Sequence, residues 1–251
     1  MVKLVYADLL QNFFKGLNEI LRYMLTFKGK VVEKKQLTDD VILLSLAAPE
    51  EFTFQAGQFV TLRIEKGSEY KLKSYSILNP PSQKGRLDLC IKIIDGGFAS
   101  EVFLETKVGD QFEVKGPLGH FVFDDKDKNK ELWFVGTGTG VAPLYSMIKE
   151  GLTKKYNKKY VLLFSVRSKK DIFLDEMFRS LAKKYANFTY MPTLTREEWE
   201  GATGRVYKHL PEDAENKTFY ICGLKEFVLE VKDFLIKKDV CSEYIKYERY
   251  S

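Results

Sequence analysis

The stretch 132–148, with the sequence LWFVGTGTGVAPLYSMI, decides the fold of the chain. It begins with four apolar residues, as a buried strand does, and the segment from Pro143 carries apolar side chains at helical spacing. Between them lie three alternate glycines, Gly136, Gly138 and Gly140. A strand, a glycine loop and a helix present backbone N–H groups and the positive end of the helix to a phosphate. The spacing is GxGxG and not the dinucleotide fingerprint GxGxxG, so by itself the stretch also fits a glycine-rich turn in any α/β protein.

Length and composition limit the possible classes of protein. The chain has 251 residues and three cysteines, which are too few and too widely separated for a disulfide framework, a metal site or an iron–sulfur cluster. Its net charge of +5 is mild, and opposite charges are interspersed, which argues against nucleic-acid binding. No apolar run is long enough to span a membrane, and the first residues lack a signal-peptide pattern. We therefore expect a cytoplasmic protein of one large or two modest domains, without a metal.

Three patterns follow one another along the chain. Residues 5–26 carry apolar side chains at helical spacing, which predicts an amphipathic helix that docks on its own domain or, alternatively, on a membrane or a partner. Residues 28–126 contain short strand patterns, a hairpin turn at 37–40 and one helix, and predict a small antiparallel β-barrel or sandwich. Residues 127–251 alternate strand and helix patterns, which is typical of a doubly wound parallel α/β sheet. The predicted units are therefore 1–27, 28–126 and 127–251.

Six short motifs occur in a fixed order that a known family shares. They are Lys73-Ser74-Tyr75-Ser76, Ile91-Lys92-Ile93, Gly97-Phe98-Ala99-Ser100, Thr137-Gly138-Thr139-Gly140, Cys222-Gly223 and Glu248-Arg249-Tyr250. In this order, and with a barrel ahead of an α/β half, the chain from about Gly29 to its C-terminus resembles the ferredoxin–NADP(+) reductase family of flavoproteins. The resemblance implies an FAD-binding β-barrel domain, an NADP(H)-binding α/β domain and the cofactors FAD and NADP(H).

The first three motifs resemble the FAD-binding segments of that family. In its Arg-x-Tyr-Ser motif the arginine binds the pyrophosphate, the tyrosine packs on the flavin and the serine lies beside the reactive ring nitrogen, and Lys73, Tyr75 and Ser76 occupy these places. Lys73 keeps the charge of the arginine but lacks its bidentate fork, so we expect weaker FAD retention or a different pyrophosphate geometry. The segments 91–93 and 97–100 resemble the second pyrophosphate-binding part, and Ser100 also suits a capping role at the start of a helix.

The later motifs resemble the nucleotide-binding half. The loop 137–140, followed by Pro143, is similar to the family's GTGxGxxP loop beside the nucleotide pyrophosphate, and Thr139 is similar to a threonine that touches the flavin. Cys222-Gly223 resembles a Cys-Gly motif beside the nicotinamide, although a buried thiol on an apolar strand is an ordinary core residue.

The C-terminal residues resemble the family's Glu-x-Tyr ending. There the tyrosine covers the flavin until nicotinamide displaces it, and the carboxylate lies near the reacting atoms. Glu248 and Tyr250 occupy these places, Ser251 extends the chain by one residue, and a frayed terminus is the alternative.

The choice of nucleotide depends on four residues of the α/β half. Arg167 follows the strand pattern 160–166, Asp171 begins the next element, and Arg196 and Arg205 lie further along, an arrangement similar to the NADP-using bacterial members of the family. Arginine suits the 2′-phosphate, whereas an NAD site uses a carboxylate for the free ribose hydroxyl. A single loop arginine is also commonly a solvated surface charge. The pattern favours NADP.

The resemblance predicts a monomeric ferredoxin–NADP reductase, which passes hydride between NADPH and FAD and single electrons to or from an acidic ferredoxin or flavodoxin. Its catalytic residues are expected to be Ser76, Cys222, Glu248 and Tyr250, which stack nicotinamide on the flavin. The alternative in the same class is an NADH-dependent reductase component that serves an oxygenase or a cytochrome. Two other classes remain: a flavin- or nucleotide-binding sensor without turnover, and a membrane-docked adaptor that uses the N-terminal helix.

Overall fold

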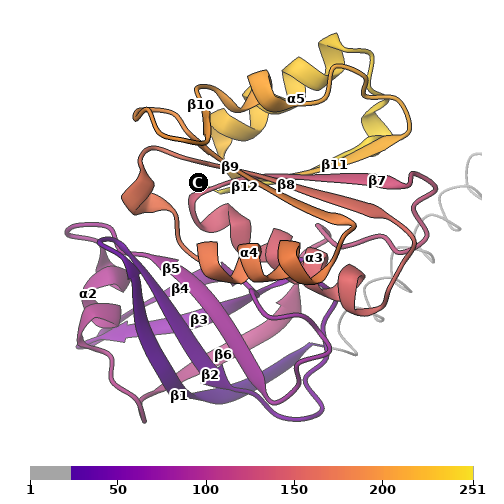
Figure 1. The fold of residues 1–251 in the computed structure, drawn as a ribbon. Coiled ribbons are helices and arrows are strands. Elements are labelled where there is room, and N and C mark those ends of the chain that lie inside the picture. The colour runs from indigo at the N-terminus through magenta and orange to yellow at the C-terminus, as the bar shows by residue number, and fades with distance from the viewer. Residues whose placement is uncertain (1–23, 251) are drawn as a thin grey trace, which may run out of the picture.

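The computed structural model describes residues 24–250 and arranges them in two sheets with their helices (Figure 1). The helix expected at 5–26 therefore lies outside the described residues, except for its last three positions. Of these, Leu25 and Thr26 belong to strand β1 (Leu25–Thr38). The expectation of a helix up to 26 is wrong at this end, because the backbone of 25–30 pairs with β6 (Gln111–Leu118) from the Leu25↔Gly116 pair onward.

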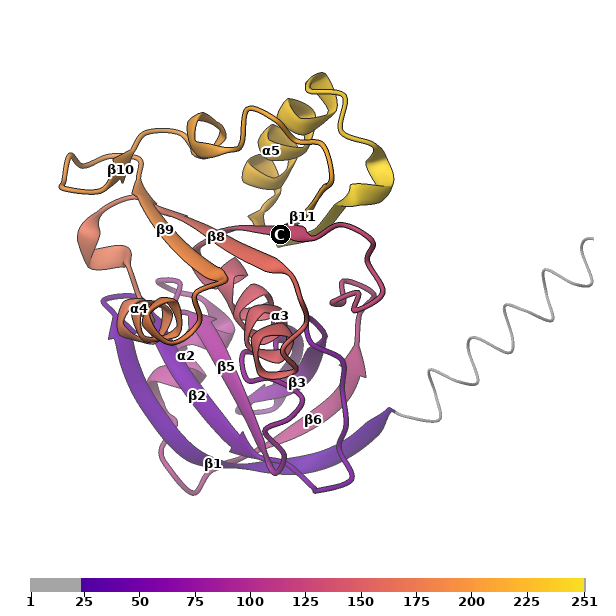
Figure 2. The same cartoon turned by 45° about the vertical axis from the view of Figure 1, so that its right-hand side comes forward.

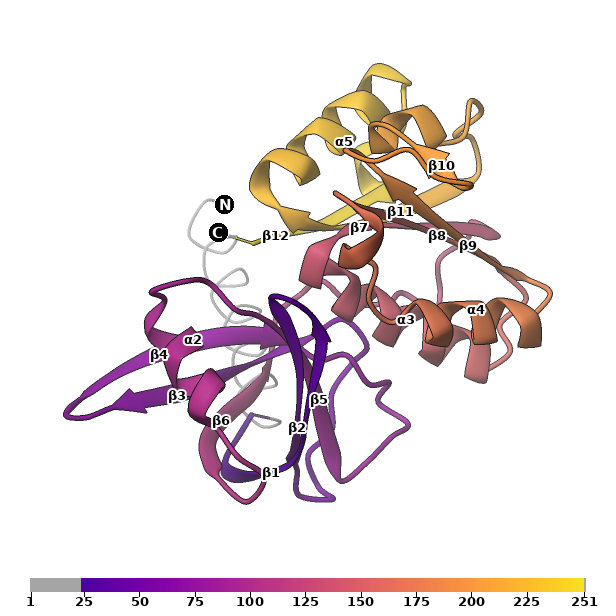
Figure 3. The same ribbon diagram turned by 60° about the vertical axis from the view of Figure 1, so that its left-hand side comes forward.

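The N-terminal sheet is a curled antiparallel half-barrel, as expected. Its order is β4-β3-β6-β1-β2-β5, with the further strands β2 (Val41–Ala47), β3 (Phe59–Lys66), β4 (Glu69–Ser76) and β5 (Arg86–Lys92). Alternate residues of these strands face inward and form a core with Phe103 of helix α2 (Phe98–Glu105). The strand β4 lies at one edge, and its residues 69–74 are exposed. The hairpin β3–β4 projects to one side of the molecule (Figure 3).

The C-terminal sheet is parallel and has helices on both faces. Its order is β10-β9-β8-β7-β11-β12, with β7 (Glu131–Thr137), β8 (Lys159–Val166), β9 (Phe188–Leu194), β10 (Ala202–Thr203), β11 (Lys217–Leu224) and β12 (Ile245–Tyr250). Helices α3 (Val141–Thr153) and α4 (Asp175–Lys184) cover the face toward the half-barrel, and α5 (Lys225–Lys237) covers the other (Figures 1 and 3). This confirms the doubly wound α/β expectation.

The C-terminal segment forms a strand that the sequence pattern did not predict. β12 pairs in parallel with β11, so that Cys222 lies beside Glu248 and Leu224 beside Tyr250. The alternative of a frayed terminus is therefore wrong up to Tyr250. The pattern missed this strand because only one of its residues, Ile245, is fully buried.

Contacts between the two sheets fix how they face each other. The hydroxyl of Ser146 on α3 donates to the backbone oxygen of Asn79 in the half-barrel at 2.9 Å, and both residues are buried. In the connecting segment, the ring of Phe123 stacks on that of Tyr220 with the ring centroids 6.2 Å apart. The carboxylate of Asp124 forms an ion pair with the ammonium group of Lys246 at 3.0 Å. Figure 2 shows α3 lying between the parallel sheet and the half-barrel. These contacts bring the carboxyl ends of β7, β8 and β11 against the half-barrel.

The structure contains, between residues 24 and 250, no helix that is both long and apolar enough to cross a membrane.

Candidate functional site

The glycine loop lies where β7 ends and α3 begins. Thr137 is the last residue of β7, and residues 138–140 form a short 3₁₀ turn. A Cβ atom at Gly140 would lie 2.4 Å from the carbonyl oxygen of Cys222, and one at Gly223 would lie 2.5 Å from the methyl group of Thr137. Glycine is required at both places because the loop that follows β7 crosses the end of β11 in close contact at Gly140, and the side chain of Thr137 packs directly on Gly223.

One glycine of the loop faces open space. Gly138 has a φ of +51°, in the left-handed region, and a Cβ atom there would meet no heavy atom of the described chain within 4 Å. Among the described residues, no side chain caps the N-terminus of α3 directly after the loop. This arrangement leaves the backbone of Gly138 and Thr139 partly exposed just before the positive end of α3, where it can meet an anion.

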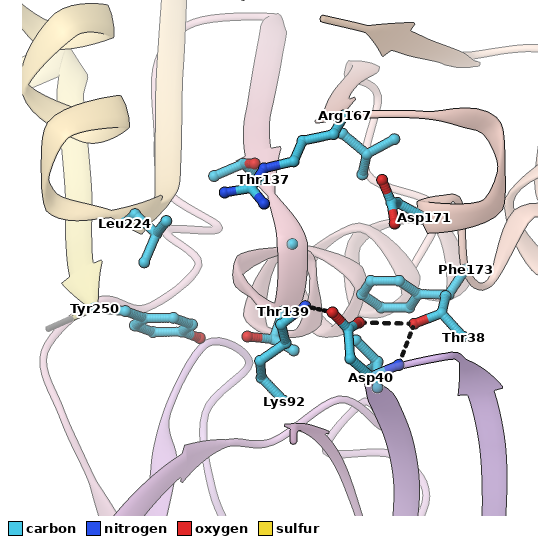
Figure 4. A pocket seen from close by; sticks show the side chains of 13 residues that line it. Thr38, Asp40, Lys92, Thr137, Thr139, Arg167, Asp171, Phe173, Leu224 and Tyr250 are labelled. Carbon is cyan, nitrogen blue, oxygen red and sulfur yellow. Dashed lines mark hydrogen bonds and ion pairs between the residues drawn. The ribbon is translucent and has the colours of Figure 1, made fainter. Parts of the chain in front are cut away.

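A cavity of about 220 Å³ lies beside this loop, at the junction of the two sheets (Figure 4). Its walls come from both halves of the molecule: Thr38, Asp40, Val41 and Lys92 of the half-barrel, and Thr137, Gly138, Thr139, Val166, Arg167, Asp171, Phe173, Leu224 and Tyr250 of the α/β half. Open α/β sheets bind nucleotides outside the carboxyl ends of their strands, and this cavity occupies that position.

The four predicted catalytic residues lie together at one end of this junction. The hydroxyl groups of Ser76 on β4 and Tyr250 on β12 are 2.7 Å apart, and the Ser76 hydroxyl donates to the Glu248 carboxylate at 3.5 Å. Cys222 lies beside Glu248 in the pairing of β11 with β12 and is fully buried. The structure therefore brings together groups from three strands that are far apart in the sequence.

Burial changes the protonation of this cluster. Burial raises the pKa of Glu248 to about 7, against a smaller opposing effect of the hydrogen bond from Ser76. Burial, together with the charge of Glu248, raises the pKa of the Cys222 thiol well above its usual value. The pKa of Tyr250 is also well above its usual value, mainly because of burial. At neutral pH the cluster therefore holds a neutral thiol, a neutral phenol and a carboxyl group that is close to half protonated.

The first FAD-like motif runs from the exposed part of β4 to its buried end at Ser76. Tyr75 is half-buried and packs edge-on against Phe103 with the ring centroids 5.6 Å apart. Lys73 and Ser74 are exposed on the edge strand β4, and the Ser74 hydroxyl lies 3.3 Å from that of Thr61. The strand thus offers a cation on an open surface, next to an aromatic ring that is half-buried against the half-barrel core.

The second and third FAD-like motifs lie on both sides of the turn that precedes α2. Gly97 occupies the N-cap position, and among the described residues no side chain caps this helix end. Ser100 is not the cap, because it lies inside the first turn, where its hydroxyl accepts a hydrogen bond from the N–H of Ile94 at 2.8 Å. It holds the turn in shape instead. Phe98 lies under the ammonium group of Lys71 at 4.7 Å, and Ala99 follows it in the first turn.

These features fit an FAD molecule. An uncapped helix N-terminus, the adjacent cations Lys71 and Lys73 and the ring of Tyr75 are the groups that a diphosphate and a flavin require. Of the segment 91–93, Ile91 is buried in the half-barrel core, and the N–H of Ile93 donates to the backbone carbonyl oxygen of Asp40 at 2.7 Å. Lys92 instead reaches the cavity beside the glycine loop.

The structure brings two of the three predicted arginines together. Arg167 lines the cavity, and the N–H of Arg196 donates to its carbonyl oxygen at 2.9 Å. Arg205 follows Gly204, whose N–H donates to the carbonyl oxygen of Leu194 at 2.8 Å, and its guanidinium group forms an exposed ion pair with Glu230 of α5 at 3.2 Å. Asp171 lines the cavity, but its carboxylate accepts hydrogen bonds from the N–H and hydroxyl groups of Ser168 in a local turn. Pro143 is buried in the first turn of α3.

Sequence reasoning missed several residues of the cavity wall. Thr38 and Asp40 were part of the expected hairpin turn, and nothing in the pattern of that turn indicates the cavity. Leu224, which is 56% exposed, follows the Cys-Gly motif by one position and extends the wall from β11. Its position directly after the Cys-Gly motif is the signal that the sequence contains, whereas its exposure is known only from the structure.

Known proteins support the assignment of both halves. Residues 28–123 match the oxidoreductase FAD-binding domain, and residues 134–233 match the oxidoreductase NAD-binding domain. Ferredoxin–NADP reductase B of Sorangium cellulosum is 32% identical over 240 residues, which cover 89% of this chain and 97% of that protein. The reductase component DmpP of phenol 2-monooxygenase from a Pseudomonas species is 29% identical over 206 residues, which cover 78% of this chain. The chain spans 58% of the length of that relative.

Solved structures have the same two-domain fold. A ferredoxin NADP+ reductase from Neisseria gonorrhoeae with bound FAD and NADP superposes with a TM-score of 0.80 at 21% identity, covering 90% of this chain and 98% of that one. The ferredoxin reductase in carbazole 1,9a-dioxygenase gives a TM-score of 0.78 at 21% identity, covering 90% and 69% of the two chains. The FAD-binding and NAD-binding domain matches and the ferredoxin–NADP reductase relative show that this chain belongs to the ferredoxin–NADP reductase-like family of flavoprotein oxidoreductases.

Proposed function

We propose that the protein is an FAD-dependent ferredoxin–NADP reductase that exchanges hydride with NADPH and single electrons with an acidic ferredoxin or flavodoxin. The observation that carries the proposal is the placement of the Ser76–Tyr250 contact at the same junction as the cavity beside the glycine loop. Flavin and nicotinamide must meet within van der Waals distance for hydride transfer, and this junction joins the two domains that would hold them.

FAD would be held by the half-barrel. The cation of Lys73 and the free N–H groups at the start of α2, in the segment 97–100, would bind its pyrophosphate, and the ring of Tyr75 would pack on the flavin. Ile91 and Ile93 would support this site from β5 and the residue beyond it. The flavin supplies the conversion between two-electron and one-electron transfer.

NADPH would be held by the α/β half. The backbone of Thr137, Gly138 and Thr139, which line the cavity, would face its pyrophosphate, and the buried Gly140 would hold the loop in place against β11. Arg167 and Arg196, on adjacent loops, would bind the 2′-phosphate. Arg205 would join them after leaving Glu230, since that ion pair is exposed and of low energy.

The cluster of Ser76, Cys222, Glu248 and Tyr250 would act at the reacting atoms. The Tyr250 phenol occupies the position against Ser76 that nicotinamide would take, so the ring must move when the nucleotide binds. Cys222 and Gly223 would position the nicotinamide from β11. Glu248, with its pKa near neutrality and its hydrogen bond to Ser76, can hold or release a proton there.

A second candidate function is an NADH-dependent reductase component that serves an oxygenase or a cytochrome. It is favoured by the likeness to the phenol 2-monooxygenase reductase component, whose identity of 29% is close to the 32% of the ferredoxin–NADP reductase relative. For either function we propose a monomer in the reducing cytoplasm, where Cys90, Cys222 and Cys241 would remain the free thiols that they are here.

An anaerobic titration of the purified protein would test this proposal. We expect a flavin absorption spectrum that NADPH bleaches at far lower concentration than NADH does. Preferential bleaching by NADH would favour the reductase-component function. A protein that contains no flavin and does not take up added FAD would contradict both candidates.

A further inference from the structure

The turn between β1 and β2 places one carboxylate inside the nucleotide cavity. Asp40 forms an ion pair with the ammonium group of Lys92, and its other oxygen accepts a hydrogen bond from the Thr38 hydroxyl at 3.1 Å. All three side chains line the cavity, opposite the glycine loop (Figure 4). The half-barrel therefore presents an ion pair, formed by Asp40 and Lys92, to the cavity in which a dinucleotide would lie.

The neighbouring residue Asp39 lies outside the cavity and has a different partner from that of Asp40. Its carboxylate pairs with Lys170 at 3.0 Å, and neither residue lines the cavity. The side chains of Asp39 and Lys170 are 81% and 72% exposed, so solvent screens this pair strongly. The side chains of Asp40 and Lys92 are only about half exposed, at 45% and 50%.

The carboxylate of Asp40 is an unfavourable group for a phosphate-binding site. Although burial acts to raise its pKa, the hydrogen bond and the charge of Lys92 lower the pKa below the usual value, so the carboxylate is ionised at neutral pH. A phosphate in the cavity would be attracted by Lys92 and by Arg167 and repelled by Asp40. The ammonium group has three donors, so a phosphate that approaches Lys92 must either displace the carboxylate or bind beside its negative charge, and both are less favourable than binding to an unpaired ammonium group.

We propose that Asp40 competes with the phosphate groups of the dinucleotide for Lys92 and thereby limits the affinity of the cavity for its substrate. The inference rests on the proposed function, because it requires that a pyridine dinucleotide binds in this cavity. It concerns affinity and not the choice of nucleotide: NADP+ and NAD+ both carry a pyrophosphate, so Asp40 weakens the binding of both. The physical consequence is easier release of the nucleotide after each turnover.

The test is isothermal titration calorimetry of the FAD-loaded protein with NADP+ and, separately, with NAD+. Asp40→Asn keeps the shape of the side chain and an oxygen that accepts from Thr38 but removes the charge. We expect its Kd for both nucleotides to fall about two- to fivefold, the size of effect that partly exposed ion pairs produce. Asp39→Asn is the matched control, since it removes the same charge from the same turn, and its Kd should stay near that of the wild type.

A double-mutant cycle shows whether Asp40 acts through Lys92. Lys92→Gln should weaken the binding of both nucleotides, and adding Asp40→Asn to that background should tighten binding clearly less than it does with Lys92 present, because only the direct repulsion by Asp40 is then removed. Thermal unfolding of each variant checks that it is folded.

Several outcomes would overturn the inference while leaving the proposed function intact. In one such outcome the wild type binds the nucleotides, and Asp40→Asn binds them with the same Kd or a higher one. Others are equal tightening by Asp39→Asn and Asp40→Asn, or an undiminished effect of Asp40→Asn without Lys92. A wild-type protein that binds neither nucleotide would contradict the proposed function, and the inference with it.

Discussion

The buried carboxyl group of Glu248 makes a quantitative prediction about stability and pH. Its pKa is about 7 in the folded protein, against a usual value of 4.5. Below pH 4.5 the group is protonated in the folded and the unfolded chain, so burial costs little. As the pH rises from 4.5 to 7, the unfolded chain ionises first, and above about pH 7 the folded protein bears the full cost of a buried carboxylate. The contribution of Glu248 to stability therefore falls as the pH rises.

The structure sets the size of this effect. The difference between 4.5 and about 7 corresponds to about 3 kcal/mol, since each pH unit is worth about 1.4 kcal/mol. Glu248 is only partly buried by its accessible surface, so we expect about 1–2 kcal/mol after allowing for solvent screening. In Glu248→Gln this cost is absent at every pH. The variant should gain about 1–2 kcal/mol of unfolding free energy relative to the wild type between pH 4.5 and 8.

The assay is urea unfolding of wild type and Glu248→Gln at several pH values, with FAD held at a constant excess because a bound cofactor shifts the transition. Glu198→Gln, at an exposed loop position, is the control and should show no such trend. A difference between Glu248→Gln and wild type that stays constant from pH 4.5 to 8 would refute the reasoning. It would mean that Glu248 remains solvated and is ionised at neutral pH.

Three further predictions concern the nucleotide side of the site. Arg196→Ala should raise the KM for NADPH about tenfold and leave the KM for NADH nearly unchanged, because one charge-assisted hydrogen bond to the 2′-phosphate is lost. Equal effects on both KM values in steady-state kinetics would rule out contact with the 2′-phosphate. Deletion of Tyr250 and Ser251 should tighten nicotinamide binding and alter the flavin spectrum in difference titrations, and unchanged values of both would exclude a covering role for Tyr250. Gly140→Ala should destabilise the protein by about 2 kcal/mol or more in urea unfolding, because the added Cβ would lie 2.4 Å from the Cys222 carbonyl oxygen. A variant as stable as the wild type would show that the two backbones can separate there.

Most of the secondary structure followed from local patterns. The helix at Lys225–Lys237 begins and ends where its apolar spacing predicted, and β7, β8 and β9 extend the predicted segments by a few residues. Such elements have side chains that alternate or repeat with one clear period, because one face or both faces are buried. β12 lacks this signal, since it is an edge strand with mostly polar, half-exposed residues.

The motifs identified the chemistry of the site but not its contacts. The glycine loop and the Cys-Gly motif can be identified from sequence because only glycine permits the close crossing of two backbones there. The capping role of Ser100 is wrong, because its hydroxyl accepts a hydrogen bond from the N–H of Ile94. The role of Arg205 at the nucleotide stays a prediction, and in this structure its side chain pairs with Glu230. A local pattern contains no information about such competing partners.

The sequence by itself therefore determined the order of the two domains, the position of the glycine loop and the residue types available for FAD and nucleotide, since all of these depend on neighbouring residues. Only the tertiary structure decided which of these groups meet. Ser76 and Tyr250 are 174 positions apart and come into contact because β12 pairs with β11 at the junction with the half-barrel. Asp40 and Lys92, 52 positions apart, meet in the cavity because β2 pairs with β5. Contacts of this kind depend on how whole strands pair and pack, and no single stretch of the chain specifies them.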